Sequence, residues 1–451
     1  MERYDSYKDS GVKWLGEIPS HWEMKKIKHV IVKSKDGIKI GPFGSSLTGK
    51  VKDNGDYKVY GQWNIVGNDF SINRNFVDFE TYNNLSAYQI SAGDILVSMM
   101  GTVGKCSIIP KDIVPGIMDS HVVKIRLVED IILPEYFVYL YDKDNSKIVY
   151  EQILKNRKGS IMDGLNSSLI KLLILPIPSI DEQKKMVAYL NVVTSKIDTA
   201  IAQQQKMIDL LNERKQIIIN NAVTKGIDPS VPLKDSGLKW IGEIPSEWKI
   251  MKTLFVLSMP ITDGPHETPQ FYDEGIPFVS AEAVSCGNGN IDFDHIRGYI
   301  SPSFYEECCK KYIPQRNDIY MIKSGATTGK VALVDTDRIF TIWSPLAVFR
   351  CNKNIMFYKF MFYLLQSGLY QTQVQLGWTY GTQQNIGMRT LEKLVIPVPS
   401  LEEQTKLSKY LDEAIGKIEK VKKNVEKTIS LLQERKQIII NDVVTGKLKV
   451  L

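Results

Sequence analysis

The chain of 451 residues contains one fifteen-residue passage twice, and this duplication constrains its fold more than any other feature. Residues 8–22 read KDSGVKWLGEIPSHW and residues 234–248 read KDSGLKWIGEIPSEW, which agree at twelve of fifteen positions. Both copies keep two tryptophans and a proline in register. Self-similarity of this length at a long interval indicates that a whole structural unit was duplicated in tandem.

Two further passages recur in the same order. LPIPSIDEQKKMVAYLN at 175–191 returns as IPVPSLEEQTKLSKYLD at 396–412, and LLNERKQIIINNAVT at 210–224 returns as LLQERKQIIINDVVT at 431–445. The chain therefore consists of two units, roughly 1–226 and 227–451. Each has a front box, a long middle, a Pro-x-Pro segment and a terminal segment, and TKGIDPSVPL, with its glycine and prolines, joins the units.

The terminal segments are predicted to be long helices, because their apolar residues recur at alternating intervals of three and four. Each follows Pro-x-Pro-Ser and carries two acidic residues in its first turn. Each would span about forty residues, or roughly 60 Å. Since tandem units related by a two-fold axis oppose their helices, we expect the two stripes to pack antiparallel within one chain. The residues expected in this pairing are Met186, Leu190, Val193, Ile197, Leu211, Leu407, Leu411, Ile418, Val421, Val425 and Leu432.

The middles of the two units have diverged. Short runs rich in Val, Ile, Tyr and Phe, broken by Gly, Asn and Asp, predict mixed α/β domains with several strands. GDILVSMMGTVGK at 93–105 corresponds to NDIYMIKSGATTGK at 317–330, and little else matches. The predicted fold class is mixed α/β, with two globular domains separated by two long antiparallel coiled-coil helices in a pseudo-two-fold tandem repeat. A retained frame around diverged middles fits a protein that presents two different recognition surfaces.

Composition narrows the class of protein. The net charge of +6 and the pI near 8.7 permit a nucleic-acid partner without requiring one. The five cysteines form no C-x-x-C pair and lie at no zinc-ligand spacing from the five histidines, so we expect no metal site and no disulfide framework. No apolar run approaches the ~20 residues of a membrane helix. The first residues contain no apolar signal region, so we expect a cytoplasmic location.

The sequence lacks the motifs of several enzymes. Neither the Asn/Asp-Pro-Pro-aromatic motif nor the glycine-rich methyl-donor motif of a DNA methyltransferase occurs, and no cluster of carboxylates with a lysine suggests metal-assisted hydrolysis. GSSLTGKV at 44–51 has the spacing of a phosphate-binding loop, but Val51 stands where a hydroxyl should bind magnesium. A nucleotide-binding enzyme using Gly44–Lys50, a coiled-coil adaptor protein and a DNA-binding protein all stay open at this point.

Several glycine-containing loops carry side chains suited to DNA. Cations beside a glycine can meet phosphates, while amide, hydroxyl and aromatic side chains can pair or stack with bases. The candidate DNA-contacting residues are Phe43, Ser45, Ser46, Lys105, Lys155, Arg157, Lys158, Ser160, His266, Thr268, Lys330, Trp378, Tyr380, Thr382, Gln383, Gln384 and Asn385.

The combination resembles the specificity subunit of type I restriction-modification systems. The resemblance is carried by the SG-x-K-W-[LI]-G-E-I-P-x-x-W box, the PxPS-x-x-EQ helix start and the LLxERKQIIIN segment of each unit, together with GPFGSSL and DGPHETP followed by GIPFVS. It implies target-recognition domains at 1–178 and 227–399, a long helix with a linker at 179–226 and a second long helix at 400–451. Each domain would read one half of a split DNA site, and the helices would set the gap.

The resemblance also implies that the chain is not itself catalytic. In that family, two modification subunits use S-adenosylmethionine to methylate adenine N6, and restriction subunits supply translocation and cleavage driven by ATP and Mg²⁺. The implied partners are therefore double-stranded DNA, two modification subunits and restriction subunits, in a bacterial or archaeal cytoplasm. No cofactor is expected on this chain. Neither the bases of the half-sites nor the gap length follows from the sequence.

Overall fold

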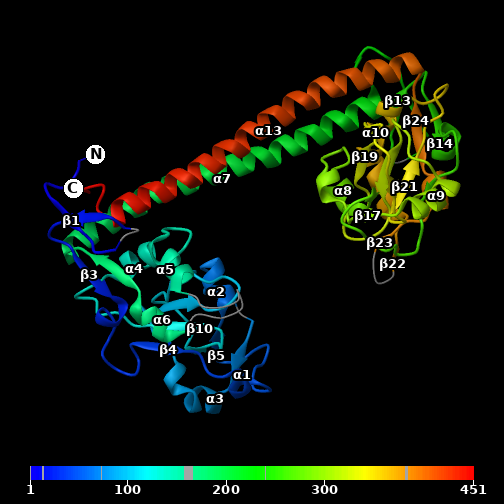
Figure 1. Ribbon diagram of the computed structural model, residues 1–451. Helices are drawn as coiled ribbons and strands as arrows, with labels where there is room; N and C mark the ends of the chain where they lie inside the picture. The colour runs from blue at the N-terminus through cyan, green and yellow to red at the C-terminus, as the bar shows by residue number, and fades with distance from the viewer. Residues whose placement is uncertain are drawn as a thin grey trace. The chain divides into compact units, whose positions relative to one another are not determined.

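The computed structural model describes residues 2–12, 15–72, 74–156, 166–238, 240–380 and 384–450. It divides into two compact units: the first combines Met1–Gln205 with Lys427–Leu451, and the second is Lys206–Glu426. Each unit contains one globular domain and a part of each long helix (Figure 1). The units cut across the sequence-based boundaries, because each helix begins in one unit and ends in the other.

Both predicted long helices are present. Helix α7 spans Ile180–Lys225 and helix α13 spans Leu401–Val444. A serine precedes each helix and accepts a hydrogen bond from a backbone amide of the first turn, at 3.3 Å in Ser179 and 3.2 Å in Ser400. These serines, with the acidic residues that follow them, complement the unpaired amides at a helix N-terminus. The repeated Pro-x-Pro-Ser segment is therefore the local signal that starts each helix.

The two helices are antiparallel in each unit. In the first unit, Lys436 Nζ of α13 lies 2.7 Å from the carboxylate of Asp198 of α7. In the second unit, Lys215 Nζ of α7 lies 2.6 Å from Glu419 Oε1 of α13. In the second unit the start of α13 also lies beside the end of α7, because a Cβ on Gly226 would come 3.6 Å from Glu403 Oε1, so the helices run in opposite directions there.

The apolar stripe of the helices agrees with the expected one, with a single correction. Val421 is 46% exposed, because the inward side of α13 runs through Ile415, Ile418, Lys422 and Val425. Half-buried Lys422, four positions after Ile418, therefore takes the place expected for Val421. The other expected residues are buried or half-buried: Met186, Leu190, Val193, Ile197, Leu211, Leu407, Leu411, Ile418, Val425 and Leu432.

A four-stranded antiparallel sheet forms the centre of the first domain. Alternate residues of its strands face two cores: Val97 and Val123 pack toward the helices that cover this sheet, and Leu96 and Val122 pack toward a smaller second sheet. The central sheet has the order β4 (Ile38–Ile40), β10 (Val122–Ile125), β7 (Ile95–Ser98) and β8 (Cys106–Ile108). The second sheet has the order β6 (Phe76–Val77), β5 (Tyr57–Tyr60) and β9 (Gly116–Met118). The covering helices are α4 (Pro134–Tyr141), α5 (Ile148–Asn156) and α6 (Ser167–Leu172).

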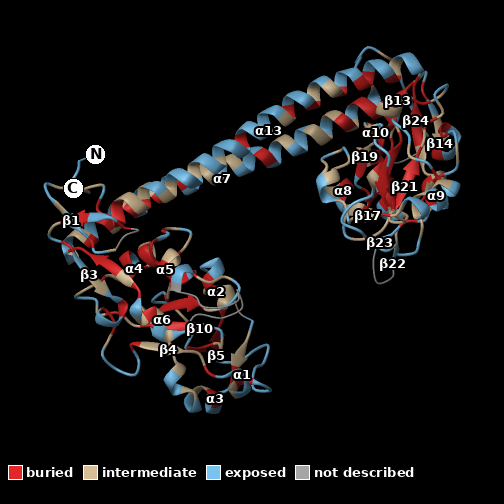
Figure 2. Cartoon of the chain, viewed as in Figure 1, coloured by how far each residue is buried: buried red, intermediate tan, exposed pale blue. Residues whose placement is uncertain are grey.

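The second domain repeats this topology strand for strand, although its sequence has diverged. Its central strands, red in Figure 2, are buried on both faces, because a hydrophobic core lies on each side of them. Its sheets have the orders β15 (Thr262–Asp263), β21 (Leu346–Phe349), β18 (Ile319–Ile322), β19 (Val331–Leu333), and β17 (Tyr299–Ile300), β16 (Ile276–Val279), β20 (Thr341–Ile342). Its helices are α8 (Ala281–Cys286), α9 (Pro302–Lys311), α10 (Tyr358–Gln366), α11 (Gly368–Leu376) and α12 (Met388–Lys393). The predicted mixed α/β class is confirmed.

The duplicated front box joins the beginning of one long helix to the end of the other. In the first unit, the indole nitrogen of buried Trp22 lies 3.4 Å from Glu182 at the start of α7. Gly446, just after α13, has a φ of +74° and packs so closely that a Cβ there would lie 2.3 Å from Pro19. Both the positive φ and the close packing require glycine at this position. Trp22 and Pro19 therefore fasten both helices to the first domain.

The second unit uses the second copy of the box in the same way. Buried Trp248 donates a hydrogen bond of 2.9 Å to Glu403 at the start of α13. Gly226, just after α7, again has a positive φ, of +72°. A Cβ at this position would lie 3.7 Å from the Trp248 ring. One passage occurs twice because each unit has one helix start and one helix end to fasten.

The glutamine of each helix start fixes a buried turn. Gln404 Oε1 accepts from the Phe357 amide at 2.7 Å, and Gln404 Nε2 donates to the carbonyls of Ile355 and Pro399 at 2.9 Å each. Gln183 makes the equivalent three bonds in the first unit. Because both side chains are fully buried, water cannot replace these partners.

We expect Gln404→Met to lower the free energy of unfolding of the second unit by about 3 kcal/mol, since it leaves several buried backbone groups without a partner. Chemical denaturation of the full chain would measure this loss. Gln203→Met is a matched control, because Gln203 is exposed on α7. An equal effect of the two substitutions would contradict the structural role given to Gln404.

Candidate nucleic-acid interface

Loops from four parts of the sequence meet at one edge of the second domain. They are the loop after β15, the loop between β18 and β19, the loop between β20 and β21, and the hairpin of β22 (Thr379–Tyr380) and β23 (Gln384–Asn385). The Ser344 amide donates to Pro265 O at 3.2 Å, and the Gly325 amide donates to Gln384 O at 3.0 Å. A third bond, from the Lys323 amide to Pro345 O at 2.8 Å, joins these two pairs of loops into one surface.

This surface brings together candidates that are far apart in the sequence. Gln384 and Asn385 are exposed on β23, and Thr268 is exposed on the loop after β15. The His266 side chain on the same loop is 72% exposed, with Nε2 3.2 Å from Asp263 Oδ2. Amide, hydroxyl and imidazole groups on adjoining loops can donate to and accept from base edges.

Lys323 and Trp343 belong to the same edge, and sequence reasoning missed both. Lys323 begins the loop after β18, and its Nζ lies 3.3 Å from Asp263 Oδ2. Trp343 follows β20, and the Arg297 guanidinium lies 4.7 Å from its ring centroid. A signal for Lys323 was available, because the match of GDILVSMMGTVGK with NDIYMIKSGATTGK sets it opposite Met99. Trp343 lies in a stretch with no recognised counterpart.

Trp378 packs against the hydrophobic core of the second domain. Its indole nitrogen is buried without a hydrogen-bond partner among the residues that the structure describes. The indole ring therefore packs within the domain and is not an open surface on which a base could stack. Its role in DNA contact stays a prediction.

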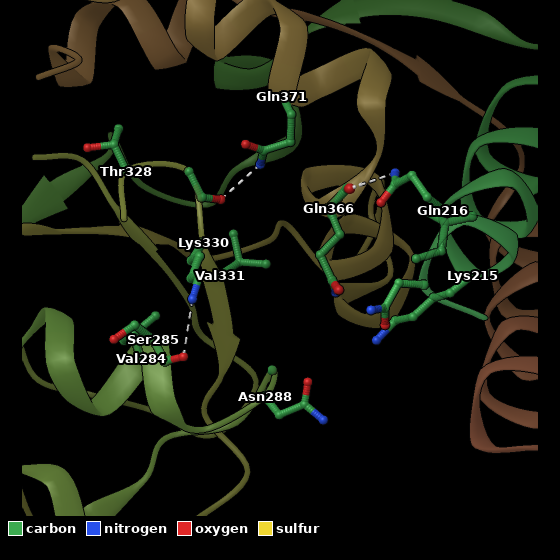
Figure 3. Close-up of a pocket in the computed structure, with 14 residues that line it drawn as sticks. Lys215, Gln216, Val284, Ser285, Asn288, Thr328, Lys330, Val331, Gln366 and Gln371 are labelled. Carbon is green, nitrogen blue, oxygen red and sulfur yellow. Dashed lines mark hydrogen bonds between the residues drawn. The ribbon is translucent and has the colours of Figure 1, made fainter. Parts of the chain in front are cut away.

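Lys330 faces a pocket of about 410 Å³ beside α7 (Figure 3). Its Nζ points to the carbonyl of Ser285 at 3.5 Å, and neighbouring Gly329 accepts a bond of 2.8 Å from Gln371. Lys215 and Gln216 of α7 line the same pocket. Lys330 thus lies at the α7 side of its loop, whereas Gly325 at the other end contacts β23.

Several amides of the glycine-rich loops are already bonded within the protein. In the second domain, the amides of Thr328, Gly329 and Lys330 all donate to backbone carbonyls, at 2.8 to 3.2 Å. In the first domain, the amides of Ser46 and Lys50 donate to carbonyls at 2.8 and 3.0 Å within the turn formed by α1 (Gly44–Leu47). A phosphate-binding loop needs such amides free, so this geometry weighs against the nucleotide-binding alternative.

The first domain presents an equivalent edge with different side chains. The Met99 amide donates to His121 O at 3.1 Å, and Gln62 Nε2 donates to the same oxygen at 3.2 Å. Phe43, in the loop after β4, is 85% exposed. Ser45 beside it is exposed and Ser46 is half-buried. Gln62 and His121 were missed as edge residues, since only the pairing of distant strands places them beside the loop after β7.

Lys105 is held by carboxylates within the first domain. Its Nζ lies 3.4 Å from Asp142 and forms a second ion pair with Asp144. Burial opposes the charge of this lysine, but the two carboxylates outweigh it and raise the pKa of Lys105. Its contact with DNA stays a prediction, and any such contact would compete with these ion pairs.

A buried ion pair supports the central sheet of each domain. Arg350 donates two hydrogen bonds of 2.7 Å to Asp318, and Arg126 donates bonds of 2.7 and 2.8 Å to Asp94. These bonds raise the pKa of both guanidinium groups above the ordinary value. The aspartate shared by GDILVS and NDIYMI thus has a structural role that its sequence match did not reveal.

Lys155 is exposed near the end of α5. Arg157, Lys158, Ser160, Thr382 and Gln383 lie outside the described residues, as does the side chain of Tyr380.

In the described part of the chain, no group of three or more His, Cys, Asp or Glu side chains could hold a metal ion. Over the same residues, no helix is both long and apolar enough to cross a membrane.

The fold and its edges define a class of protein: two recognition domains of one topology on a shared pair of helices.

The chain belongs to the family described as the type I restriction modification DNA specificity domain, whose sequence model matches residues 19–208 and 268–427. It is 26% identical over 447 residues to the putative type I restriction enzyme MjaX specificity subunit of Methanocaldococcus jannaschii, covering 97% of this chain and 96% of that protein. It is also 25% identical over 341 residues to the MjaVIII specificity subunit of the same organism, covering 74% and 75%.

Solved structures include a similar fold. A chain from a study of complex assembly and conformational transition of the type I R-M system superposes with a TM-score of 0.69 at 16% identity, covering 96% of this chain and 99% of that one. The family assignment predicted from the duplicated boxes is confirmed.

Proposed function

We propose that this chain is the DNA sequence-specificity subunit of a type I restriction-modification complex. Its two domains each read one half of a split double-stranded DNA site, and the paired helices set the gap between the halves. The observation that carries this proposal is the contrast between the edges of the two domains. Equivalent loops carry Phe43 and His121 in one domain but His266 and Trp343 in the other, on one common topology.

The two domains therefore differ where bases would be read and agree where the chain must fold. A duplicated enzyme would instead keep the same reactive groups in both copies. A coiled-coil adaptor would explain the helices, but it would leave the exposed polar side chains that meet on adjoining loops without a role.

Partner subunits complete the activity in this proposal. Two modification subunits bring S-adenosylmethionine and methylate adenine N6, while restriction subunits bring ATP, Mg²⁺ and cleavage, in a bacterial or archaeal cytoplasm. Two modification subunits are supported by a repeated apolar feature of the long helices. Leu210 and Ile217 of α7, and Leu431 and Ile438 of α13, are each about half exposed at equivalent positions. Two like patches suit two copies of one partner.

We expect the purified chain alone neither to methylate nor to cut DNA, and to direct methylation only when a modification subunit is present. Mapping of methylated adenines in a host that produces both proteins would give one motif with two short halves and a fixed gap. Methylation by the rigorously purified chain would contradict the non-catalytic role. Scattered methylation without a split motif, or none above that of the modification subunit alone, would contradict the specificity role.

A further inference from the structure

We infer that the buried ion pair between Asp263 and Lys323 positions the base-reading loops of the second domain, and so determines specificity at one half-site only. This inference rests on the proposed function. Asp263 ends β15, and its side chain is fully buried. Two lysines and one imidazole surround it, each from a different segment: Lys323 at 3.3 Å, His266 at 3.2 Å, and Lys311 of α9.

Lys323 is the residue at which the four loops of this edge meet. Its amide donates to Pro345 O of the loop after β20 at 2.8 Å, and its carbonyl accepts from the Ile386 amide just after β23 at 2.9 Å. Its side chain, only 12% exposed, reaches Asp263 at the start of the loop that carries His266. A shift of Lys323 would therefore move the loops that present Gln384 and His266 together.

A buried ion pair suits this positioning role. Its attraction is strong where water is scarce, and its geometry is narrow, because an incorrect placement leaves the mostly buried charge of Lys323 without its partner. Apolar contacts tolerate small slips that an ion pair does not. The pair therefore restricts where the loops lie more strongly than it adds to the stability of the domain.

The first domain shows that the fold does not require this pair. There Met99 occupies the place of Lys323, since its amide bonds to His121 O as that of Lys323 bonds to Pro345 O. Ile40 occupies the place of Asp263, because each ends the edge strand of the central sheet and precedes a closely packed glycine. Ile40 and Met99 both pack against the core of the first domain.

The contrast separates the two roles that the pair could have. If folding alone needed a filled site beneath the loops, an Ile–Met pair would serve in both domains. The charged pair of the second domain instead accompanies a different set of edge side chains. The double variant Asp263→Ile with Lys323→Met places the Ile–Met pair of the first domain at the equivalent positions of the second.

The test uses the full chain with its modification subunit and a library of duplexes randomised in both half-sites. Bound duplexes are sequenced, and thermal unfolding is measured in parallel. We expect Asp263→Asn and Lys323→Met each to reduce base preference about tenfold at one or more positions of one half-site, and to leave the other half-site and the gap unchanged. The double variant should recover the thermal midpoint lost by the single variants without recovering the base preference. Lys310→Met, an exposed lysine beside Lys311, should change neither.

Three results would overturn the inference. Single variants with unchanged base preference would show that the pair does not position the loops. A double variant with wild-type preference would show that the pair only stabilises the domain. Equal loss at both half-sites would show an effect on the whole chain. Failure of the unaltered complex to enrich any split motif would instead refute the proposed function itself.

Discussion

Replacing residues 249–396 by the corresponding middle of a related chain will change one half of the methylated motif and leave the other half and the gap unchanged. The replaced segment begins in β14 (Lys249–Lys252) and ends in β24 (Val395–Val398), which pair antiparallel. Its two ends are therefore adjacent in space, and the second domain can be exchanged as a module. The long helices α7 and α13, the front box and Gln404 all lie outside the exchanged segment.

The matching exchange in the first domain is the control. Residues 23–175 begin in β3 (Glu23–Lys26) and end in β11 (Ile174–Ile177), which also pair antiparallel. This exchange should change the other half of the motif. Methylated-adenine mapping measures both results in the same assay. If either exchange altered both halves together, recognition would not be modular and the assignment of one half-site to each domain would be wrong.

The frame of this protein could be predicted from the sequence because its signals are local and written twice. Pro-x-Pro-Ser followed by acids starts each helix, and the apolar spacing gives the pairing face. The sequence defines the rotational position of the stripe less sharply, since intervals of three and four approximate a period of 3.6 only on average. The exposure of Val421, which the spacing placed in the pairing face, is an error of this kind.

The candidate interface could be predicted only in part, because the state of a loop side chain depends on partners from distant segments. Lys105 is held by Asp142 and Asp144, which no spacing in the sequence connects to it. Lys330 lines a pocket together with α7, which precedes it by about a hundred residues. The role of Lys323 follows from bonds to three other loops. Glycine-rich composition located the loops, but tertiary contacts decide which of their side chains are available.

Adding seven residues to both long helices will lengthen the gap of the recognised site. The insertions belong between Asp198 and Lys215 in α7 and between Glu419 and Lys436 in α13, so that both ion pairs keep their partners. A heptad preserves the inward face of a paired helix and adds roughly 10 Å at 1.5 Å per residue. At 3.4 Å per base pair, this is about three base pairs. The bases of both half-sites should stay the same.

The same insertion also tests whether the helices measure distance alone. Three base pairs turn the duplex by roughly a third of a turn, at 10 to 10.5 base pairs per turn, whereas a heptad turns a paired helix much less. We therefore expect methylation at the new gap to be weaker than that of the unaltered complex at the original gap. An insertion in α7 alone is the control: it moves Lys215 out of register with Glu419, so it should lower the thermal midpoint and abolish methylation of any split site. Full methylation at the original gap by the double insertion would show that the paired helices do not set the spacing.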